Sequence, residues 1–327
     1  MSVAAAVPFV IGQWVCGPRF YGRKAEIAEL LGSRELWLWI AGLRRIGKTS
    51  LLKQMDYLTG SDGRILPLFW DLQGAGGVEE LGLTFTDALL DAEETMARQG
   101  IALEEVEDGD LFASLEKLAH VLKRRGTELL LLCDEADELG GLDRAVPGLA
   151  ARLWQAVDGF AAARVVLASS PRLCLAEPFT APRFLGALTD EEARALLCQS
   201  QLPDAARPVF DAAGMEKLRE QCGNHPMLLQ IAAKRWYEMG DVDEALRQVA
   251  ADRAVQHLLA VDFELLTSAE QQLLRSVARE QGGPAVDAGR LLDLGLVRHD
   301  PRGLAVANRF LAAWLRQESE AGFGDRF

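Results

Sequence analysis

Short apolar runs alternate with helical patterns in the first half of the chain. Five such runs predict β-strands, at residues 35–41, 65–71, 128–133, 164–168 and 183–185. Between them apolar residues recur at helical spacing, which predicts helices at residues 48–58, 78–99 (one or two helices), 110–125 and 148–159. Strands that alternate with helices indicate an α/β fold, in which helices sandwich a parallel sheet.

The chain becomes almost entirely helical after residue 188. Apolar residues at helical spacing predict four helices, at residues 189–200, 208–222, 226–240 and 241–259. A compact group of helices that directly follows a sheet domain suits a lid. We therefore expect a helical lid domain at residues 188–260, after an α/β domain at residues 1–187.

The last seventy residues follow a third pattern. Thr267 and Glu270 form a capping box that starts a helix. A short helix at 286–294, two β-like runs joined by a turn, and a last helix capped by Asn308 come next. This order of helix, helix, hairpin and helix predicts a winged helix-turn-helix domain at residues 261–327.

Composition excludes several classes of protein. Hydrophobic residues make up 49% of the 327 and charged residues 25%, which is typical of a globular protein. No apolar run is long enough for a transmembrane helix, and the N-terminus lacks the basic region of a secretory signal. The five cysteines are scattered without a C-x-x-C pair, which argues against a zinc knuckle or a disulfide scaffold. We expect a cytoplasmic protein.

The net charge of −13 disfavours nucleic acid as the main partner. Proteins that grip nucleic acid need a basic surface to neutralise phosphates. The excess of acidic over basic residues in the whole chain does not exclude a local basic patch.

The segment from Gly42 to Thr49, GLRRIGKT, matches the phosphate-binding motif G-x-x-x-x-G-K-[ST]. It follows an apolar strand and opens a helix, as that motif requires. Its backbone amides would surround the β-phosphate of ATP or ADP, Lys48 would reach the β- and γ-phosphates, and the Thr49 hydroxyl would bind Mg²⁺. The predicted nucleotide contacts here are Gly42, Arg45, Ile46, Gly47, Lys48, Thr49 and Ser50.

A second strand ends in the acidic pair Asp134 and Glu135. Next to a phosphate loop, such a pair predicts that Asp134 holds Mg²⁺ and that Glu135 polarises the attacking water. The same letters, DEAD, mark a helicase class, but that class needs a second sheet domain, which the pattern after residue 188 does not offer.

Three further positions near the predicted site leave alternatives open. Ser169 follows the fourth strand and would help Lys48 and Glu135 in catalysis by orienting water, unless it is a plain turn. Arg172 or Arg183 would act as an arginine finger across a subunit boundary, unless each is a solvent-facing charge. We interpret Gly223-Asn-His-Pro226 as a turn that presents backbone to the nucleotide.

The order of the motifs resembles a known family. Phe20-Tyr-Gly-Arg23 with Glu26, GLRRIGKTSLL, LLCDEAD, LGALTDEEARALL, CGNHPMLLQ and the terminal winged-helix pattern together resemble the STAND-like branch of AAA+ ATPases, above all the archaeal-type AAA-like ATPases. The resemblance covers roughly residues 8–315.

This resemblance implies an ASCE-type sheet of order 5-1-4-3-2, a lid and a winged helix. It also implies that Gly22 and Arg23 lie near the nucleotide base and that Pro226 contacts the nucleotide from the lid. Such proteins are switches in which ADP holds a closed form, while ATP opens it and drives oligomerisation or signalling to a protein partner. The chain shows neither a repeat sensor region nor an effector domain, so we expect sensing and output to come from other chains.

Two other functions compete with a slowly hydrolysing ATPase switch. A DNA-binding ATPase of the initiator or transposition-regulator type would use the winged helix, but residues 262–316 hold seven arginines against seven acidic residues, and the predicted recognition helix carries only Arg290. A kinase would need an acceptor site, which the lid sequence does not show. We expect a protein partner, a homo-oligomer or both, and no membrane.

Overall fold

The computed structural model describes residues 7–173, 181–280, 287–301 and 303–320. Its five-stranded sheet is parallel, in the order β2-β3-β4-β1-β5. The strands are β1 (Trp37–Ala41), β2 (Ile65–Asp71), β3 (Glu128–Asp134), β4 (Ala163–Ser169) and β5 (Arg183–Phe184). The sheet confirms the predicted fold class and strand order, and each strand lies within two residues of its predicted bounds.

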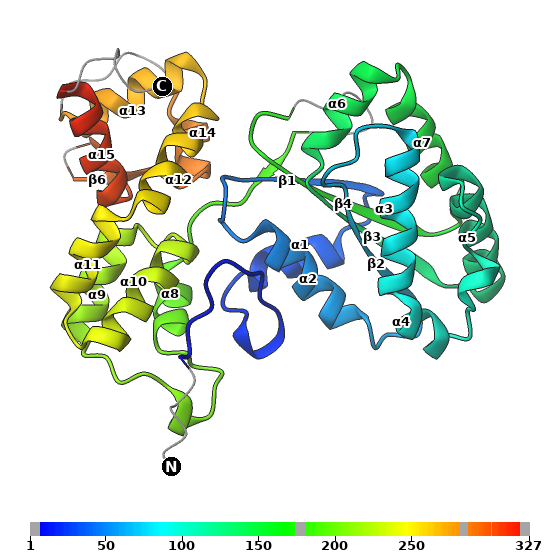
Figure 1. Ribbon diagram of the computed structural model, residues 1–327, viewed down its shortest axis with the longest axis horizontal. Helices are drawn as coiled ribbons and strands as arrows, with labels where there is room; N and C mark the ends of the chain where they lie inside the picture. The colour runs from blue at the N-terminus through cyan, green and yellow to red at the C-terminus, as the bar shows by residue number, and fades with distance from the viewer. Residues whose placement is uncertain (1–6, 174–180, 281–286, 302, 321–327) are drawn as a thin grey trace.

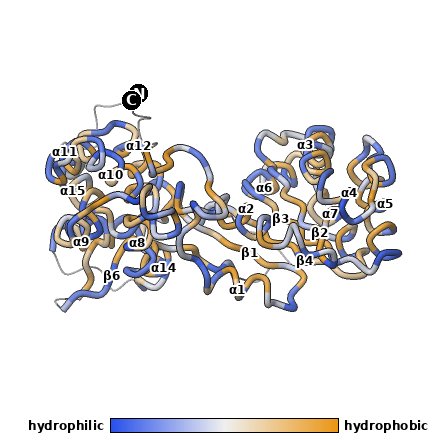
Figure 2. Tube along the Cα trace, turned by 90° about the horizontal axis from the view of Figure 1, so that it is seen from below, coloured by the Kyte–Doolittle hydropathy of each residue, from blue (hydrophilic) through white to orange (hydrophobic). Residues whose placement is uncertain are grey.

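Helices cover both faces of the sheet. Alternate strand residues point to opposite sides, and the apolar side chains on each side pack against helices. On β3, Leu129 and Leu131 belong to the cluster formed with α3 (Val78–Asp91), α4 (Glu93–Arg98), α5 (Leu111–Arg125), α6 (Asp137–Ala145) and α7 (Leu149–Asp158). Leu130 and Leu132 belong to the opposite cluster, formed with α1 (Lys24–Gly32) and α2 (Lys48–Thr59). In Figure 2, β1 and its neighbours are coloured as hydrophobic, as strands buried on both faces require. The sequence patterns did not predict α1 and α6.

The predicted lid contains α8 (Asp190–Leu197), α9 (Ala212–Cys222), α10 (Pro226–Met239) and α11 (Val242–Ala251). The prediction of one helix at 241–259 is wrong, because a second helix, α12 (Arg253–Glu264), begins after Asp252. The Asp252 backbone is extended, and its carboxylate accepts the Ala254 N–H at 2.8 Å. Asp252 therefore caps a new helix, which extends beyond residue 260.

The chain then forms α13 (Ser268–Ala278), α14 (Gly289–Asp293), the antiparallel strands β6 (Val297–Asp300) and β7 (Gly303–Val306), and α15 (Arg309–Glu320). The capping box of Thr267 with Glu270 is confirmed. Asn308 accepts the N–H groups of Phe310 and Leu311, as a cap should. Part of the predicted helix at 286–294 lies outside the described residues, and the winged-helix assignment stays a prediction.

Figure 1 shows two halves, with the sheet and its helices in one half and α8–α15 in the other. One hydrophobic cluster extends through α8–α15 and includes Leu43 of the predicted phosphate loop. The boundaries at residues 187 and 260 stay predictions. No helix in the described part of the chain has the length and apolar character to cross a membrane.

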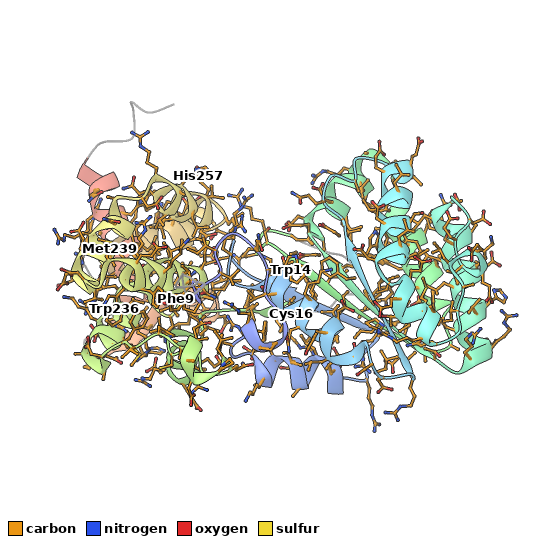
Figure 3. All side chains as sticks on the ribbon, turned by 60° about the horizontal axis from the view of Figure 1, so that its bottom comes forward. Phe9, Trp14, Cys16, Trp236, Met239 and His257 are labelled. Atoms are coloured by element: carbon orange, nitrogen blue, oxygen red, sulfur yellow. The ribbon has the colours of Figure 1, made fainter. Side chains whose placement is uncertain are left out.

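The N-terminal segment connects the two halves. Phe9 stacks on Phe210 at a centroid distance of 5.9 Å, and the Val15 N–H donates to Ser50 Oγ of α2 at 3.1 Å. Figure 3 shows Phe9 among the lid helices and Trp14 nearer the sheet. Residues 7–23 therefore pack across the junction beside the phosphate loop.

Candidate nucleotide site

The phosphate loop has the backbone that its sequence predicts. Gly47 has φ +103°, and the loop turns again at Arg45, with φ +58°. The Gly42 N–H donates to Ser169 O at 3.1 Å, which fixes the start of the loop to the end of β4. Gly47 adopts its conformation without the steric cost of a side chain, so the motif can curve directly from β1 into α2.

Lys48 is the lysine of the phosphate-binding motif. Its ammonium donates to Gly42 O at 2.9 Å and Leu43 O at 3.0 Å. Burial lowers the pKa of Lys48, and the carboxylates of Glu135 and Asp134 oppose that shift. The ammonium therefore lies between the loop and the acidic end of β3, as the phosphate-binding role requires.

Asp134 and Thr49 lie together at the end of the sheet. Burial raises the pKa of Asp134, and a hydrogen bond from the Thr49 side chain opposes the rise. Asp134 Oδ1 is buried and has no hydrogen-bond partner among the described residues. A buried acceptor beside a hydroxyl suits Mg²⁺, which commonly binds one or two side chains together with phosphate oxygens.

No group of three or more His, Cys, Asp or Glu side chains within residues 7–173, 181–280, 287–301 and 303–320 could hold a metal ion. Mg²⁺ at Thr49 and Asp134 would therefore need the phosphates as further ligands. Asp71, which the sequence reasoning did not select, pairs with Asp134 in the sheet register and adds negative charge there.

Glu135 is exposed to solvent next to this pair. Its backbone is left-handed, with φ +50°, which is uncommon for a residue with a side chain. Desolvation raises its pKa, and the charge of Asp134 adds to the rise. A carboxylate with a raised pKa and access to water suits the predicted role of accepting a proton from water.

Ser169 is completely buried at the end of β4. Its hydroxyl accepts the Trp39 Nε1–H at 2.8 Å and donates to Ser170 O at 2.9 Å. These contacts give the residue a structural role, and its water-orienting role stays a prediction.

Arg23 lies at the junction between the loop and the lid. Its guanidinium donates to Ile46 O at 3.5 Å and to Gly186 O, which belongs to the connection before the lid. Its own N–H donates to Glu192 at 2.6 Å, and a Cβ on Gly22 would lie 2.8 Å from that carboxyl carbon. The predicted contact of Gly22 and Arg23 with the base stays a prediction, and Arg23 contacts the phosphate loop through Ile46 O.

The turn before α10 packs toward the same place. Asn224 has φ +55°, and its carbonyl accepts the Leu188 N–H at 3.1 Å. His225 caps α10, in which Pro226 is the first residue. Burial lowers the pKa of His225 to about 4, and the Arg44 backbone opposes this shift. The side chain of His225, not only the turn backbone, therefore faces the phosphate loop.

The candidate arginine fingers are both engaged within the chain. Arg183 pairs with Glu29 at 2.6 Å and with Glu35 at 3.2 Å. Arg172 donates to the Glu264 carbonyl at the end of α12. An arginine finger across a subunit boundary stays a prediction.

Non-glycine residues with positive φ concentrate in these motifs. Six are described, and four of them are Arg23, Arg45, Glu135 and Asn224. Such conformations cost free energy and persist where the surrounding structure imposes them, which is common at functional sites. The site therefore combines the loop, the acidic strand end, the N-terminal segment and the lid turn.

Solved structures with a similar fold include a Walker-type ATPase and an ORC2 protein. A Walker-type ATPase of Pyrococcus abyssi matches with a TM-score of 0.64 and 16% identity, over 94% of this chain and 99% of that chain. The ORC2 protein of Aeropyrum pernix in its ADP form matches with a TM-score of 0.53 and 17% identity, over 94% and 96% of the two chains. This chain has the fold of the AAA+ P-loop ATPases. No protein-family model and no curated protein matches the sequence.

Proposed function

We propose that this protein is a P-loop ATPase that binds ATP with Mg²⁺, hydrolyses it slowly and acts as a nucleotide-dependent switch. The observation that carries the proposal is Asp134: it is hydrogen-bonded to the Thr49 side chain, and its buried Oδ1 has no hydrogen-bond partner within the described part of the chain. A structural carboxylate would have its oxygens satisfied. The Aeropyrum pernix ORC2 protein, which has a similar fold, was solved as ADPNP-ADP complexes.

The roles of the residues follow from their positions. The loop amides and Lys48 bind and orient the phosphates, and the Thr49 hydroxyl and Asp134 hold Mg²⁺. Bound Mg²⁺ supplies positive charge that stabilises the leaving phosphate oxygens. Glu135 accepts a proton from the water that attacks the γ-phosphorus, and the bond to the bridging oxygen breaks to give ADP and phosphate.

The switch is proposed to act on a protein partner or on the oligomeric state, in the cytoplasm. The lid turn and α12 both contact the phosphate loop, so a nucleotide there would affect the position of α8–α15. The STAND-like resemblance and the winged-helix assignment belong to this proposal.

DNA binding by the C-terminal elements is the alternative. Several of their arginines are already engaged within the chain: Arg290 with Glu270, Arg309 with Glu220, and Arg316 with the Ala278 carbonyl. Phosphate and base contacts would need these side chains. Docking of a protein is therefore favoured, and a shift assay at low salt that showed tight DNA binding would reverse this preference.

The test is ATP binding and hydrolysis by the native chain and three variants. Lys48→Ala should weaken ATP binding about tenfold to a hundredfold, because the phosphates lose a charged partner. Glu135→Gln should bind ATP normally but hydrolyse it at least about a hundredfold more slowly. Glu138→Gln, on α6 nearby, is the matched control. Normal hydrolysis by Glu135→Gln would disprove the role assigned to Glu135.

A further inference from the structure

A carboxylate from the half of the molecule that contains α8–α15 accepts a hydrogen bond from one N–H group of the phosphate loop. Asp262 of α12 is 5% exposed, and its Oδ1 accepts the Arg44 N–H at 3.0 Å. Arg44 is the third residue of the loop motif. Its amide N–H, a group of the kind that binds phosphate in such loops, is therefore already satisfied by an anionic side chain.

The position of Asp262 is unfavourable for a purely structural residue. The cavity around it is lined mainly by apolar side chains, among them Leu43, Ile46, Leu258 and Phe263. Burial raises the pKa of Asp262 to about 7, although the Arg44 hydrogen bond and the Lys48 cation oppose the rise. An apolar residue would fill this place at lower cost. The carboxylate is therefore better explained by a role at the loop.

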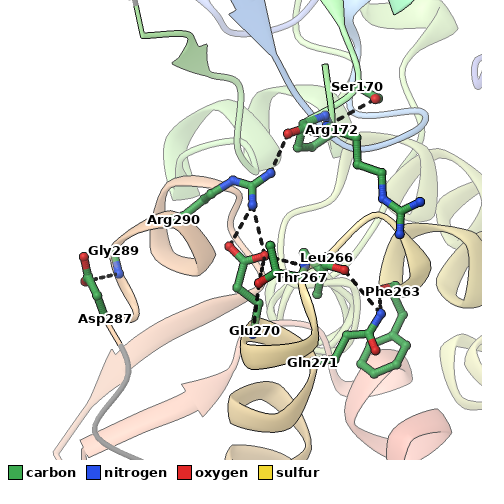
Figure 4. Close-up of polar contacts among 11 residues, drawn as sticks. Ser170, Arg172, Phe263, Leu266, Thr267, Glu270, Gln271, Asp287, Gly289 and Arg290 are labelled. Carbon is green, nitrogen blue, oxygen red and sulfur yellow. Dashed lines mark hydrogen bonds and ion pairs between the residues drawn. The ribbon is translucent and has the colours of Figure 1, made fainter. Parts of the chain in front are cut away.

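The elements that follow Asp262 hold the segment after β4. Arg172 donates to the Glu264 carbonyl, and Arg290 donates to both Glu270 oxygens at 2.9 and 3.0 Å and to the Pro171 carbonyl. Figure 4 shows the Arg290 guanidinium between Glu270 and the segment that carries Ser170 and Arg172. The contact of Asp262 with the loop is thus part of a larger docking surface.

Two glycines allow the backbone to approach the C-terminal elements closely. A Cβ on Gly186, in the connection before the lid, would lie 2.6 Å from the Asp293 carbonyl oxygen. A Cβ on Gly223, in the lid turn, would lie 2.6 Å from the Ala307 carbonyl oxygen. The backbone therefore packs directly against α14 and the end of β7, which leaves little freedom to shift while docked.

We propose that Asp262 is an autoinhibitory residue: its carboxylate holds an amide of the phosphate loop, and its charge near Lys48 opposes the terminal phosphate of ATP, so that ATP binding is coupled to release of α12–α15. The Arg44 N–H cannot serve the Asp262 carboxylate and a phosphate oxygen at full strength together. Lys48, which would bind the β- and γ-phosphates, lies within the electrostatic reach of Asp262. The contacts of Arg172 and Arg290 involve the segment after β4, which borders the same end of the site. Asp262 can have this role only if the loop binds ATP, so the inference rests on the proposed function.

The first experiment compares affinities for Mg²⁺-ADPNP and Mg²⁺-ADP by titration calorimetry. Asp262→Ala removes the competing acceptor and its charge and should bind ADPNP about tenfold more tightly, a gain of ~1.4 kcal/mol, while the gain for ADP, which lacks the terminal phosphate, should be smaller. Asp262→Asn removes the charge alone and should fall between. Glu264→Gln, an exposed position on the same helix, is the matched control and should behave as the native chain.

The outcomes separate this inference from the proposed function. If the native chain and Lys48→Ala fail alike to bind ADPNP, the proposed function is wrong and the inference falls with it. If the native chain binds ADPNP but Asp262→Ala and Asp262→Asn bind it no more tightly than Glu264→Gln, only the inference is wrong. Equal gains for ADP and ADPNP would also contradict competition with the terminal phosphate.

The second experiment tests release of α12–α15 through amide hydrogen exchange. ADPNP should speed exchange in peptides from α12 and from residues 170–173 of the native chain, and ADP should not. Gly186→Ala keeps Asp262 but disfavours docking, so it should show the faster exchange without nucleotide and bind ADPNP more tightly. Unchanged exchange with ADPNP, or native affinity in Gly186→Ala, would contradict the coupling.

Discussion

Asp262→Asn tests how a carboxylate at the phosphate loop affects folding stability. The pKa of Asp262 is raised by burial to about 7 from its ordinary value of 3.8. A shift of about three pH units, at about 1.36 kcal/mol per unit, corresponds to ~4 kcal/mol. Between these two values the folded chain keeps a proton that the unfolded chain releases, so the free energy of unfolding falls as pH rises. Above about pH 7 Asp262 is ionised in both the folded and the unfolded state, and the stability that its bound proton gave the folded state is lost.

The assay is urea unfolding of the nucleotide-free chain between about pH 5 and pH 8, followed by tryptophan fluorescence. Asp262→Asn is neutral throughout, so it should gain about 3 kcal/mol relative to the native chain over this range. His225, which faces the same loop, stays neutral here because its pKa is about 4. The cations that face Asp262, Lys48 and Arg44, are the same in both chains. Glu264→Gln should run parallel to the native chain. If Asp262→Asn also ran parallel, the Asp262 carboxylate would not be buried against the loop.

Three other substitutions follow from the same geometry. When pH falls from 6.5 to 4, the native chain should lose stability because its folded state excludes the proton that the unfolded histidine binds. His225→Gln lacks this group, so its free energy of unfolding should fall by about 3 kcal/mol less over the same range, as measured from urea midpoints. Ser169→Ala leaves the Trp39 indole N–H without its acceptor and should cost about 1–3 kcal/mol, and adding Trp39→Phe should recover most of it in the same assay. Gly42→Ala places a Cβ 3.0 Å from the Leu185 carbonyl oxygen, so ADPNP affinity measured by calorimetry should fall while the chain still folds; unchanged affinity would show that the loop adapts.

The parts that local patterns determine were predicted from the sequence. An apolar strand, a glycine-rich turn and a helix are contiguous in residues 37–59, so the phosphate loop could be placed without knowing the rest of the chain. The acidic pair at Asp134 follows a strand buried on both faces, and parallel strands bring their carboxyl ends to one edge of the sheet. Hence its proximity to Lys48 could also be inferred.

The contacts between distant segments could not be predicted in this way. Asp262 lies 218 residues from Arg44, and nothing in its apolar surroundings distinguishes it from an ordinary residue at the end of a helix. One signal was available: a charged residue within the apolar stripe of α12, which also holds Leu259 and Phe263. The helical spacing of apolar residues continues through Asp252, so the sequence pattern did not reveal it as a cap. The pattern therefore predicted one helix where α11 and α12 are separate.

The charges around Lys48 fit the proposal that one site both binds ATP and responds to it. Four carboxylates act on this one ammonium, those of Glu135, Asp134, Asp137 and Asp262. A triphosphate would add several more negative charges to the same space, so it needs compensation before it can bind. Mg²⁺ held by Thr49 and Asp134 would offset the negative charge at the end of β3, but the Asp262 carboxylate beside Arg44 would remain. Departure of Asp262 removes that charge, and because Asp262 is fixed in α12, its departure requires movement of the helix. In the proposed switch, phosphate binding and helix position are therefore linked by electrostatics.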